Sequence, residues 1–191
     1  MEGAFDYKTL AYVIGVAIGD GNLSNPNGRC LRLRVTCDTR YPHLIKHISQ
    51  SIQSILPDNK VSIVKRAITY VDISCYSNRW EQWLPWTNLR GPKSKQVIHI
   101  PSWIMRKKIF SLACLRGLIE TDGCIYIDRG YVMVNFTTVN EALAHDVDFL
   151  MNVLDFEPKM YLVNSIHMPR YTLRLARDTQ RFIELAEIDK S

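Results

Sequence analysis

Two aspartates, Asp20 and Asp122, stand in the same local setting in the two halves of the sequence. Each follows an apolar run of helix length and precedes a glycine, a pattern that by itself indicates only a helix end. Both runs place small residues four apart, on one face of a helix: Ala11, Gly15 and Gly19 in the first, and Ala113, Gly117 and Thr121 in the second. Because glycine inside a helix costs about 1 kcal/mol relative to alanine, we expect Gly15 and Gly117 to permit close contact between two helices.

Two helices that cross along these faces would bring the carboxylates of Asp20 and Asp122 together. Such a pair repels itself unless cations lie between the two groups. Carboxylate oxygens are the ligands that Mg²⁺ prefers, with water and phosphate oxygens completing its coordination. The repeated Asp-Gly therefore predicts a divalent-metal site poised to act on phosphates.

The elements that must position these acids recur in the same order in both halves. Helical and alternating patterns predict, in the first half, helices over 7–19, 42–56 and 78–89, a short strand from 21, strands over 30–36, 61–66 and 69–76, and a loop over 90–95. In the second half they predict helices from 102 and over 108–121, 141–154 and 178–188, and strands over 124–128, 131–137, 159–164 and 171–175.

These elements define an α+β protein made of two pseudo-symmetric αββαββα units. We assign residues 1–96 to the first unit, 97–107 to a connector and 108–191 to the second unit. In each unit the helices cover one face of a sheet. The opposite, polar face is free to meet a partner.

Composition narrows the class of partner. The 191 residues carry a formal net charge of +5 with a pI near 9.0, and the excess of Lys and Arg is concentrated in residues 1–101. This modestly favours a polyanionic partner. The five cysteines contain no C-x-x-C pair, which argues against a disulfide framework or a zinc site. We recognise no membrane span or export signal, and expect an intracellular protein that meets DNA in the cytoplasm, the nucleoid or an organelle matrix.

Val13–Gly21 and Leu115–Gly123 both resemble the LAGLIDADG motif of the homing endonucleases. Two copies make the chain similar to the single-chain members of that family over essentially its whole length. The resemblance implies saddle-shaped antiparallel sheets, packed through the two motif helices. It makes Asp20 and Asp122 the metal-binding catalytic acids, with the carbonyls of Gly19 and Thr121 as secondary ligands.

The two copies differ in the earlier acid of the motif, which the family resemblance implies supports the helix end. This position is Ile18 in the first copy and Glu120 in the second. The difference predicts that the two halves cut unequally.

Lys93 and Lys190 form a second repeated pair, each in a Lys-Ser dipeptide just after the last helix of its unit. A loop lysine is most often a solvated surface group. The resemblance places an active-site lysine in such a loop, where its charge polarises water or offsets charge on phosphate. Lys95 is an alternative to Lys93.

Outward strand positions are candidates for DNA contact, although an ordinary solvated sheet face would look similar. Arginine side chains can read guanine and asparagine side chains adenine. The candidates are Arg32, Arg34, Thr36, Lys65, Tyr70, Asp72 and Ser74 in the first unit, and Tyr126, Asp128, Asn135, Thr137, Lys159, Arg170, Thr172 and Arg174 in the second.

The resemblance therefore implies a monomeric homing endonuclease that cuts both strands of a long DNA site and leaves short 3′ overhangs. It implies Mg²⁺ as the cofactor, with Mn²⁺ able to replace it and Ca²⁺ binding without cleavage. The alternative is a non-cleaving binder on the same fold, either an intron RNA maturase or a transcription regulator. A hydrolase of small phosphates is disfavoured because the sequence has no glycine-rich phosphate loop.

Overall fold

The computed structural model describes residues 5–164 and 168–190 and contains two similar halves. The first half comprises α1 (Tyr7–Asp20), β1 (Gly21–Ser24), β2 (Arg32–Asp38), α2 (Pro42–Ile55), β3 (Val61–Lys65), β4 (Tyr70–Tyr76) and α3 (Trp80–Trp83), followed by single 3₁₀ turns at Asn88–Arg90 and Lys93–Lys95. The second comprises α4 (Ser102–Met105), α5 (Lys108–Asp122), β5 (Gly123–Asp128), β6 (Tyr131–Thr138), α6 (Glu141–Val153), β7 (Lys159–Val163), β8 (Arg170–Leu175) and α7 (Thr179–Leu185).

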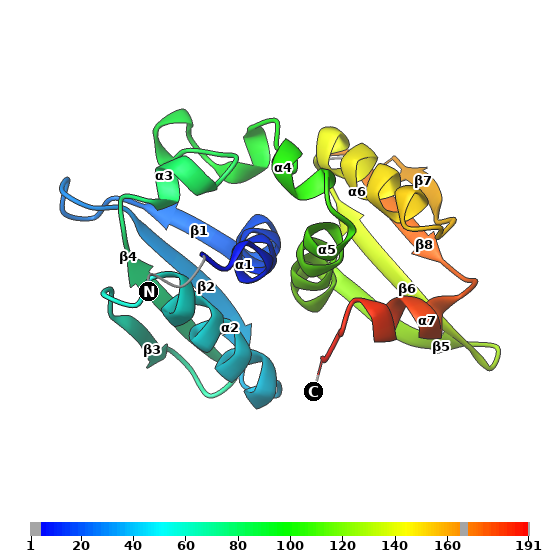
Figure 1. Cartoon of the computed structure of the whole chain (residues 1–191), viewed down its shortest axis with the longest axis horizontal. Coiled ribbons are helices and arrows are strands. Elements are labelled where there is room, and N and C mark those ends of the chain that lie inside the picture. Colours follow the sequence, from blue (N-terminus) through cyan, green and yellow to red (C-terminus); the bar gives the residue numbers. More distant parts are fainter. Residues whose placement is uncertain (1–4, 165–167, 191) are drawn as a thin grey trace.

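Each half contains one four-stranded antiparallel sheet with the same connectivity. The strand order is β1-β2-β4-β3 in the first sheet and β5-β6-β8-β7 in the second. The sheets lie on either side of the central pair α1 and α5, with α2 beside the first sheet and α6 and α7 beside the second (Figure 1). The predicted α+β class, with two antiparallel sheets joined through the motif helices, is confirmed.

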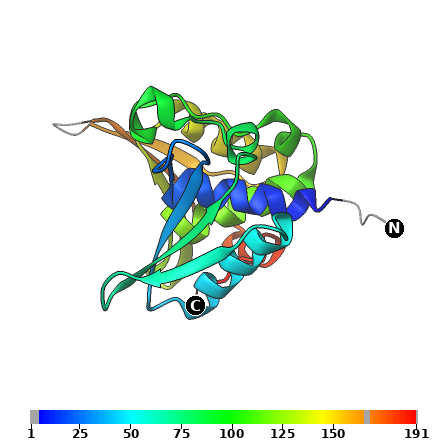
Figure 2. The same cartoon turned by 90° about the vertical axis from the view of Figure 1, so that its left-hand side faces the viewer.

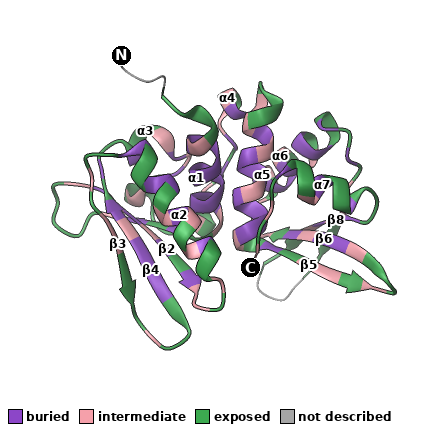
Figure 3. Cartoon of the chain, turned by 60° about the horizontal axis from the view of Figure 1, so that its bottom comes forward, coloured by how far each residue is buried: buried purple, intermediate pink, exposed green. Residues whose placement is uncertain are grey.

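Close contact between α1 and α5 forms the centre of the molecule. A Cβ atom added to Gly15 would overlap the carbonyl oxygen of Cys114, and one added to Gly117 would lie 2.5 Å from the carbonyl oxygen of Tyr12. Glycine is therefore required on both helices for backbone to meet backbone. The two helices are buried along much of their length (Figure 3), so their direction is fixed by packing on several sides.

Local sequence explains where α1 begins and how it ends. The carboxylate of Asp6 accepts a 3.0 Å hydrogen bond from the backbone N–H of Thr9 and caps the first turn. After Asp20 the chain turns directly into β1, and a Cβ on Gly21 would lie 2.7 Å from the Cα of Ala17. Figure 2 shows α1 from the side, running away from the N-terminus toward the strands. The acid at its end is thus delivered to the junction of helix and sheet.

Three predicted elements differ from the structure. The helix expected over 78–89 is only Trp80–Trp83, because Pro85 holds the preceding Leu84 in an extended conformation. The strand expected over 30–36 is Arg32–Asp38, since residues 28–30 still belong to the turn that contains Gly28 at φ 68°. The last helix ends at Leu185 rather than near 188, and Glu187 adopts a left-handed φ of 55° that redirects the chain.

The cysteines and the lengths of the helices can also be compared with what the sequence predicted. All five cysteines are free. Within residues 5–164 and 168–190, no helix combines the length and apolarity needed to cross a bilayer.

Candidate metal and nucleic-acid site

Asp20 is the last residue of α1 and Asp122 the last residue of α5, and both are exposed at the protein surface. The helix contact brings them together, because a Cβ built on Gly19 would lie 3.5 Å from the Asp122 carboxyl carbon. The repeat predicted this convergence. The two carboxylates therefore share one site, to which each half of the chain contributes one acid.

The electrostatics of this pair oppose its double ionisation. Desolvation is the main cause that raises the pKa of Asp122 to about 6, and the neighbouring Asp20 raises it further, against the lowering effect of Lys93 and Lys190. Desolvation likewise raises the pKa of Asp20, and the same two lysines oppose it. A cation bound between the acids would relieve this repulsion.

Lys93 and Lys190 both reach the C-terminal ends of the motif helices. The ammonium of Lys93 donates to the carbonyl oxygens of Ile18, at 2.7 Å, and Gly19. The ammonium of Lys190 donates to the carbonyl oxygens of Ile119, at 3.4 Å, and Gly123. Cations are favourable at helix C-termini, so each lysine caps one motif helix beside the acids. Lys95 makes no such contact in the part of the chain that is described.

Burial lowers the pKa of both ammonium groups, while the acids raise it. For Lys93, desolvation is the largest effect and is opposed by Asp122 and Asp20. For Lys190, desolvation is again the largest, and both acids are among the charges that oppose it. Each lysine is thus a partly desolvated hydrogen-bond donor at the edge of the acid pair, rather than the solvated surface group that a loop lysine usually is.

The donor set fits a hard divalent cation with open coordination positions. Within residues 5–164 and 168–190, no group of three or more His, Cys, Asp or Glu side chains is arranged so that it could hold a metal ion, so the two carboxylates are the main candidates. The carbonyl of Gly19, a predicted ligand, accepts a hydrogen bond from Lys93. The Thr121 hydroxyl donates to the carbonyl of Gly117 at 2.8 Å. Two acids with few competing ligands suit Mg²⁺, which keeps several waters or phosphate oxygens.

Glu120 and Ile18 have different roles at corresponding motif positions. Glu120 is 1% exposed, and its carboxylate accepts hydrogen bonds from the Tyr12 hydroxyl and the Arg116 Nε, both at 2.7 Å, and from the Asp189 backbone N–H at 3.0 Å. Ile18 is buried in the apolar core. Glu120 therefore supports the end of α5, because its carboxylate is occupied by hydrogen bonds from Tyr12, Arg116 and Asp189.

The outer face of the first sheet carries a charged cluster around Asp72. Its carboxylate accepts hydrogen bonds from Thr36 at 2.8 Å and Arg66 at 2.9 Å, and lies 3.9 Å from Arg34. Burial raises the pKa of Asp72, but the hydrogen bonds and the arginine charges outweigh it and leave the pKa below its usual value. Asp72 is 5% exposed, so it orients the arginines more than it offers itself to a partner.

The outer face of the second sheet is built around Arg174. This side chain pairs with Asp128 at 2.6 Å and lies opposite Asn135 on the neighbouring strand. The Asn135 amide also donates to the Tyr126 hydroxyl at 3.2 Å. Thr137 and Thr172, side by side in the same register, share a 3.2 Å hydrogen bond.

The register of the β-ladder shows that one residue predicted to lie on an outer sheet face lies on the opposite face. Lys65 lies opposite Val71, on the helix-covered side of the first sheet, because β3 pairs Val64 with Asp72. The run Val61–Lys65 alternates too weakly in polarity to reveal this. The remaining predicted strand positions do lie on the outer faces: Arg32, Arg34, Thr36, Tyr70, Asp72 and Ser74, and Tyr126, Asp128, Asn135, Thr137, Lys159, Arg170, Thr172 and Arg174.

The structure adds outer-face positions that the sequence analysis missed. Asn22 lies opposite Arg34, and the Ser24 hydroxyl accepts a 3.3 Å hydrogen bond from Arg32. Tyr161 lies opposite Thr172 on the edge strand β7. The alternation of polar and apolar residues in Asn22-Leu23-Ser24 was the available signal for the first two.

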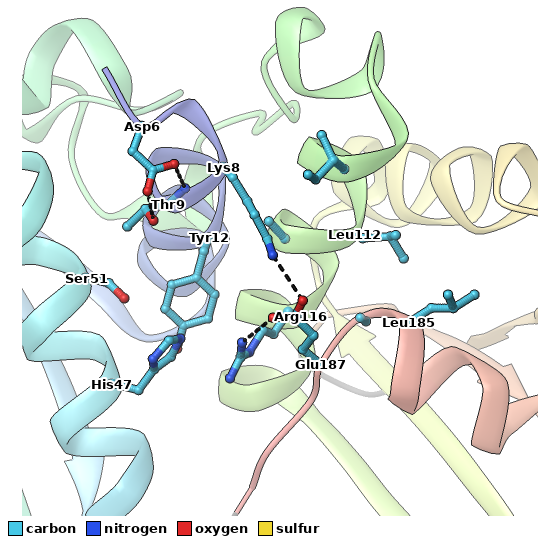
Figure 4. A pocket seen from close by; sticks show the side chains of 13 residues that line it. Asp6, Lys8, Thr9, Tyr12, His47, Ser51, Leu112, Arg116, Leu185 and Glu187 are labelled. Carbon is cyan, nitrogen blue, oxygen red and sulfur yellow. Dashed lines mark hydrogen bonds and ion pairs between the residues drawn. The ribbon is translucent and has the colours of Figure 1, made fainter. Parts of the chain in front are cut away.

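Cavities beside the motif helices differ in whether they reach the acid pair. One of about 340 Å³ is lined by Asp122, Lys93, Thr138 and Arg170, among others, and opens beside the acid pair. Another of about 410 Å³ lies among α1, α2, α5 and α7, and its lining includes none of Asp20, Asp122, Lys93 and Lys190 (Figure 4). The cavity lined by Asp122 and Lys93 is therefore the one that belongs to the candidate metal site.

Comparison with known proteins agrees with this geometry. Residues 110–186 match the model of the LAGLIDADG-like domain. No curated protein sequence matches the chain.

Solved structures extend the match to both halves. The homing endonuclease I-DmoI in complex with DNA and Ca is 22% identical with a TM-score of 0.69, over 95% of this chain and 90% of that one. Its complex with DNA and Mn is 21% identical with a TM-score of 0.68, over 94% of this chain and 96% of that one. A variant of I-DmoI with its target DNA and Mg is 21% identical with a TM-score of 0.69, over 96% of this chain and 97% of that one. The N-terminal LAGLIDADG domain of DUF199/WhiA is 12% identical with a TM-score of 0.63, over 99% of this chain and 88% of that one.

The chain therefore carries a LAGLIDADG-like domain in its second half and has the two-motif LAGLIDADG fold along almost its whole length. One particular structure that it resembles is the single-chain homing endonuclease I-DmoI, and at this level of identity the similarity establishes the fold. The resemblance of the two motifs to the LAGLIDADG family is confirmed by the domain match in the second half and by the fold of the whole chain.

Proposed function

We propose that this protein is a site-specific homing endonuclease that hydrolyses both strands of a long DNA target. The observation that carries the proposal is the convergence of Asp20 and Asp122, one from each half, with Lys93 and Lys190 at the same two helix ends. A pseudo-twofold site of this kind matches the symmetry of a duplex with two scissile phosphates.

The carboxylates of Asp20 and Asp122 are the residues that would hold Mg²⁺. A bound divalent ion supplies charge stabilisation for phosphodiester hydrolysis and lowers the pKa of a bound water. We expect Mn²⁺ to replace Mg²⁺ and Ca²⁺ to bind without supporting cleavage. Structures of I-DmoI with DNA and each of these three metals are consistent with divalent-metal use on this fold.

The protein's own cations act beside the acids. Lys93 and Lys190 are held against backbone carbonyls at the helix ends, so their positive charge is fixed before substrate arrives. Pre-set charge at the place where negative charge develops stabilises a phosphoryl transition state without reorganisation. Each lysine would offset the charge on one scissile phosphate.

The outer sheet faces would read the DNA on either side of the cut. In the part of the chain that is described, three buried polar atoms lack a hydrogen-bond partner: Arg34 Nε, Asn135 Oδ1 and Arg174 Nε. All three belong to outer-face side chains of β2, β6 and β8. Arginine and asparagine are the side chains that pair with guanine and adenine edges, so these groups are suited to base contact in the major groove. The products would carry short 3′ overhangs.

One observation favours a second candidate, a nucleic-acid binder that does not cleave. The same fold occurs in DUF199/WhiA as well as in proteins named homing endonucleases, so the fold alone does not decide activity. This candidate requires binding to DNA or intron RNA without strand cutting. The presence of both acids and both lysines at one site favours the endonuclease.

Selection of cleaved sites from a random or genomic DNA pool in Mg²⁺ tests the proposal. We expect one long sequence to be enriched, cut on both strands with staggered ends, by the monomeric protein. Enrichment of bound sequences with no nick in Mg²⁺ or Mn²⁺ would support the binder instead. Insensitivity of binding to salt would argue against both, because phosphate contacts release counterions.

A further inference from the structure

We propose that Glu120 is a positioning residue for Lys190: by accepting the backbone N–H of Asp189 it fixes the segment that carries the lysine to the end of α5. This inference rests on the proposed function, since it assigns Lys190 a task at the acid pair. It concerns a residue that touches neither metal nor DNA.

The contacts of Glu120 bind three separate segments to one carboxylate. The Tyr12 hydroxyl comes from α1, the Arg116 guanidinium from the preceding turn of α5, and the Asp189 N–H from the segment after α7. Glu120 is 1% exposed, so these bonds compensate the burial of its polar atoms. Asp189 is thereby attached to a residue in the last turn of α5.

Attachment at Asp189 determines the reach of the next side chain. The Lys190 ammonium donates to the carbonyl oxygens of Ile119 and Gly123, which flank the end of α5. Arg116 also contacts Glu187 at 3.5 Å, and Glu187 pairs with Lys8 at 3.0 Å, so the chain is held again before it reaches Asp189 (Figure 4). The segment after α7 thus depends on side-chain contacts for its position.

The first half lacks every member of this arrangement. Alignment of the two motifs places Ile18 at the position of Glu120, Ile14 at that of Arg116 and Cys114 at that of Tyr12. Alignment of the two Lys-Ser loops places Pro92 at the position of Asp189. Isoleucine offers no acceptor and proline no N–H, so acceptor and donor are absent together.

Lys93 is held in a different way. Its loop is closed by backbone bonds from Lys95 to Pro92 at 3.0 Å and from Gln96 to Lys93 at 3.1 Å. The Gln96 amide donates to the carbonyls of Thr87 at 2.7 Å and Gly91 at 2.9 Å. The two lysines therefore occupy similar places through independent supports, and loss of Glu120 should disturb only Lys190.

Matched substitutions separate the hydrogen bond from general stability. Asp189→Pro removes the N–H outside the core, whereas Asp189→Ala removes the carboxylate and keeps the N–H. Glu120→Leu removes the acceptor, whereas Glu120→Gln keeps an oxygen that can accept from Asp189. Tyr12→Phe removes a different bond to Glu120 and leaves the one to Asp189. Urea unfolding of each variant confirms that the compared proteins are folded.

The first measurement is the rate of cutting of each strand, in separate pre-nicked duplexes of the selected target. We expect Asp189→Pro and Glu120→Leu to slow one strand about 10- to 100-fold, the effect of a displaced charged group, with the other strand close to the wild-type rate. Asp189→Ala, Glu120→Gln and Tyr12→Phe should cut both strands at close to wild-type rates. Equal slowing of both strands, or Glu120→Gln as slow as Glu120→Leu, would overturn the proposal.

The second measurement does not depend on cleavage. Trace acetylation by acetic anhydride, read by mass spectrometry, reports the accessibility of each lysine amine. We expect Asp189→Pro to raise the reactivity of Lys190 at least several-fold relative to Asp189→Ala, with Lys93 unchanged as the internal reference. Unchanged Lys190 reactivity would refute the positioning role even if the wild type cuts DNA. A wild type that cuts no DNA, with Lys190 released as expected, would refute the proposed function alone.

Discussion

The ammonium of Lys93 donates a 2.7 Å hydrogen bond to the carbonyl oxygen of Ile18, in the last turn of the helix that ends in the first acid. Lys190 makes a similar contact with the carbonyl oxygen of Ile119 in the last turn of α5, at 3.4 Å. Ile18 lies two residues before Asp20 and Ile119 three residues before Asp122, so each ammonium is fixed close to an acid by backbone rather than by the acid itself. The charge of each lysine remains available to a phosphate.

Replacement of Lys93 or Lys190 by methionine should therefore affect catalysis more than folding. Methionine keeps the length of the side chain, and the lost contact at a helix C-terminus costs only about 0.3–1 kcal/mol. We expect a loss of cutting of about 100-fold or more, as for removal of other pre-set electrostatic groups, with DNA affinity little changed. Single-turnover cleavage and binding in Ca²⁺ measure the two effects. Lys95→Met is the control and should cut normally.

The close approach of the motif helices predicts a large effect of one added methyl group. Gly117→Ala would place a Cβ against the backbone of Tyr12 and Val16, at 2.5 and 2.6 Å. Neither neighbour can rotate away, so we expect a loss of at least about 2 kcal/mol in the free energy of unfolding. Urea denaturation measures it.

Gly130→Ala is the matched control for that experiment. Gly130 has a positive φ of 86° and nothing within 4 Å of an added Cβ. Its replacement should cost only about 1 kcal/mol, from backbone strain alone. Equal losses at Gly117 and Gly130 would show that helix contact is not what Gly117 provides.

The raised pKa of Asp122 predicts how metal-free stability depends on pH. A carboxyl whose pKa is higher in the folded state, here about 6 instead of 3.8, destabilises the folded state above pH 6 and has no effect below pH 3.8. Asp122→Asn should therefore stabilise the metal-free protein at pH 8 and lose this advantage as the pH falls through 6 toward 4. Because Asp122 is exposed, solvent screening limits the gain to about 1 kcal/mol.

Addition of Mg²⁺ should reverse the order of stability of the wild type and Asp122→Asn at pH 8. A metal that binds only the folded state stabilises it by an amount that grows with the logarithm of free metal concentration over Kd, so the wild type should gain stability at pH 8 and Asp122→Asn, which binds more weakly, should gain less. Thermal unfolding in EDTA and in Mg²⁺ measures both effects. A wild type whose unfolding temperature ignores Mg²⁺, Mn²⁺ and Ca²⁺ alike would contradict the assigned metal site.

Arg174 is the side chain whose loss should most clearly reduce base discrimination. It lies on the outer face of β8, paired with Asp128 and with an unpartnered Nε. Arg174→Ala should weaken binding to the selected target by about 1–3 kcal/mol and relax preference at one base pair. Lys46→Ala, which removes an equal charge at an exposed position of α2, should leave that preference intact. Competition binding with single-base variants of the target tests both.

The repeated motif made the centre of the molecule predictable from sequence. Small residues at every fourth position indicated the helix contact, and Asp20 and Asp122 followed from it because they end the same two runs. The Lys-Ser dipeptides located Lys93 and Lys190, whose contacts with helix carbonyls were not predictable, since they depend on side-chain reach across 75 and 71 residues.

Features set by pairing between distant strands were harder to predict. The face of Lys65 depends on the register of β3 against β4, and a weakly alternating strand does not reveal its register. The cluster of Arg34 and Arg66 around Asp72 similarly requires two strands and a turn to be placed together. The role of Glu120 was partly predictable from the motif, but its bond to Asp189 was not.

The most direct test of the account is the cutting of a selected target by Asp20→Asn and Asp122→Asn. Asparagine keeps the size of each side chain and removes the charge that would hold the metal. We predict that each variant binds the target with wild-type affinity in Ca²⁺ and makes no double-strand break in Mg²⁺. Double-strand cutting at the wild-type rate by either variant would contradict the central claim that the two acids form one shared site.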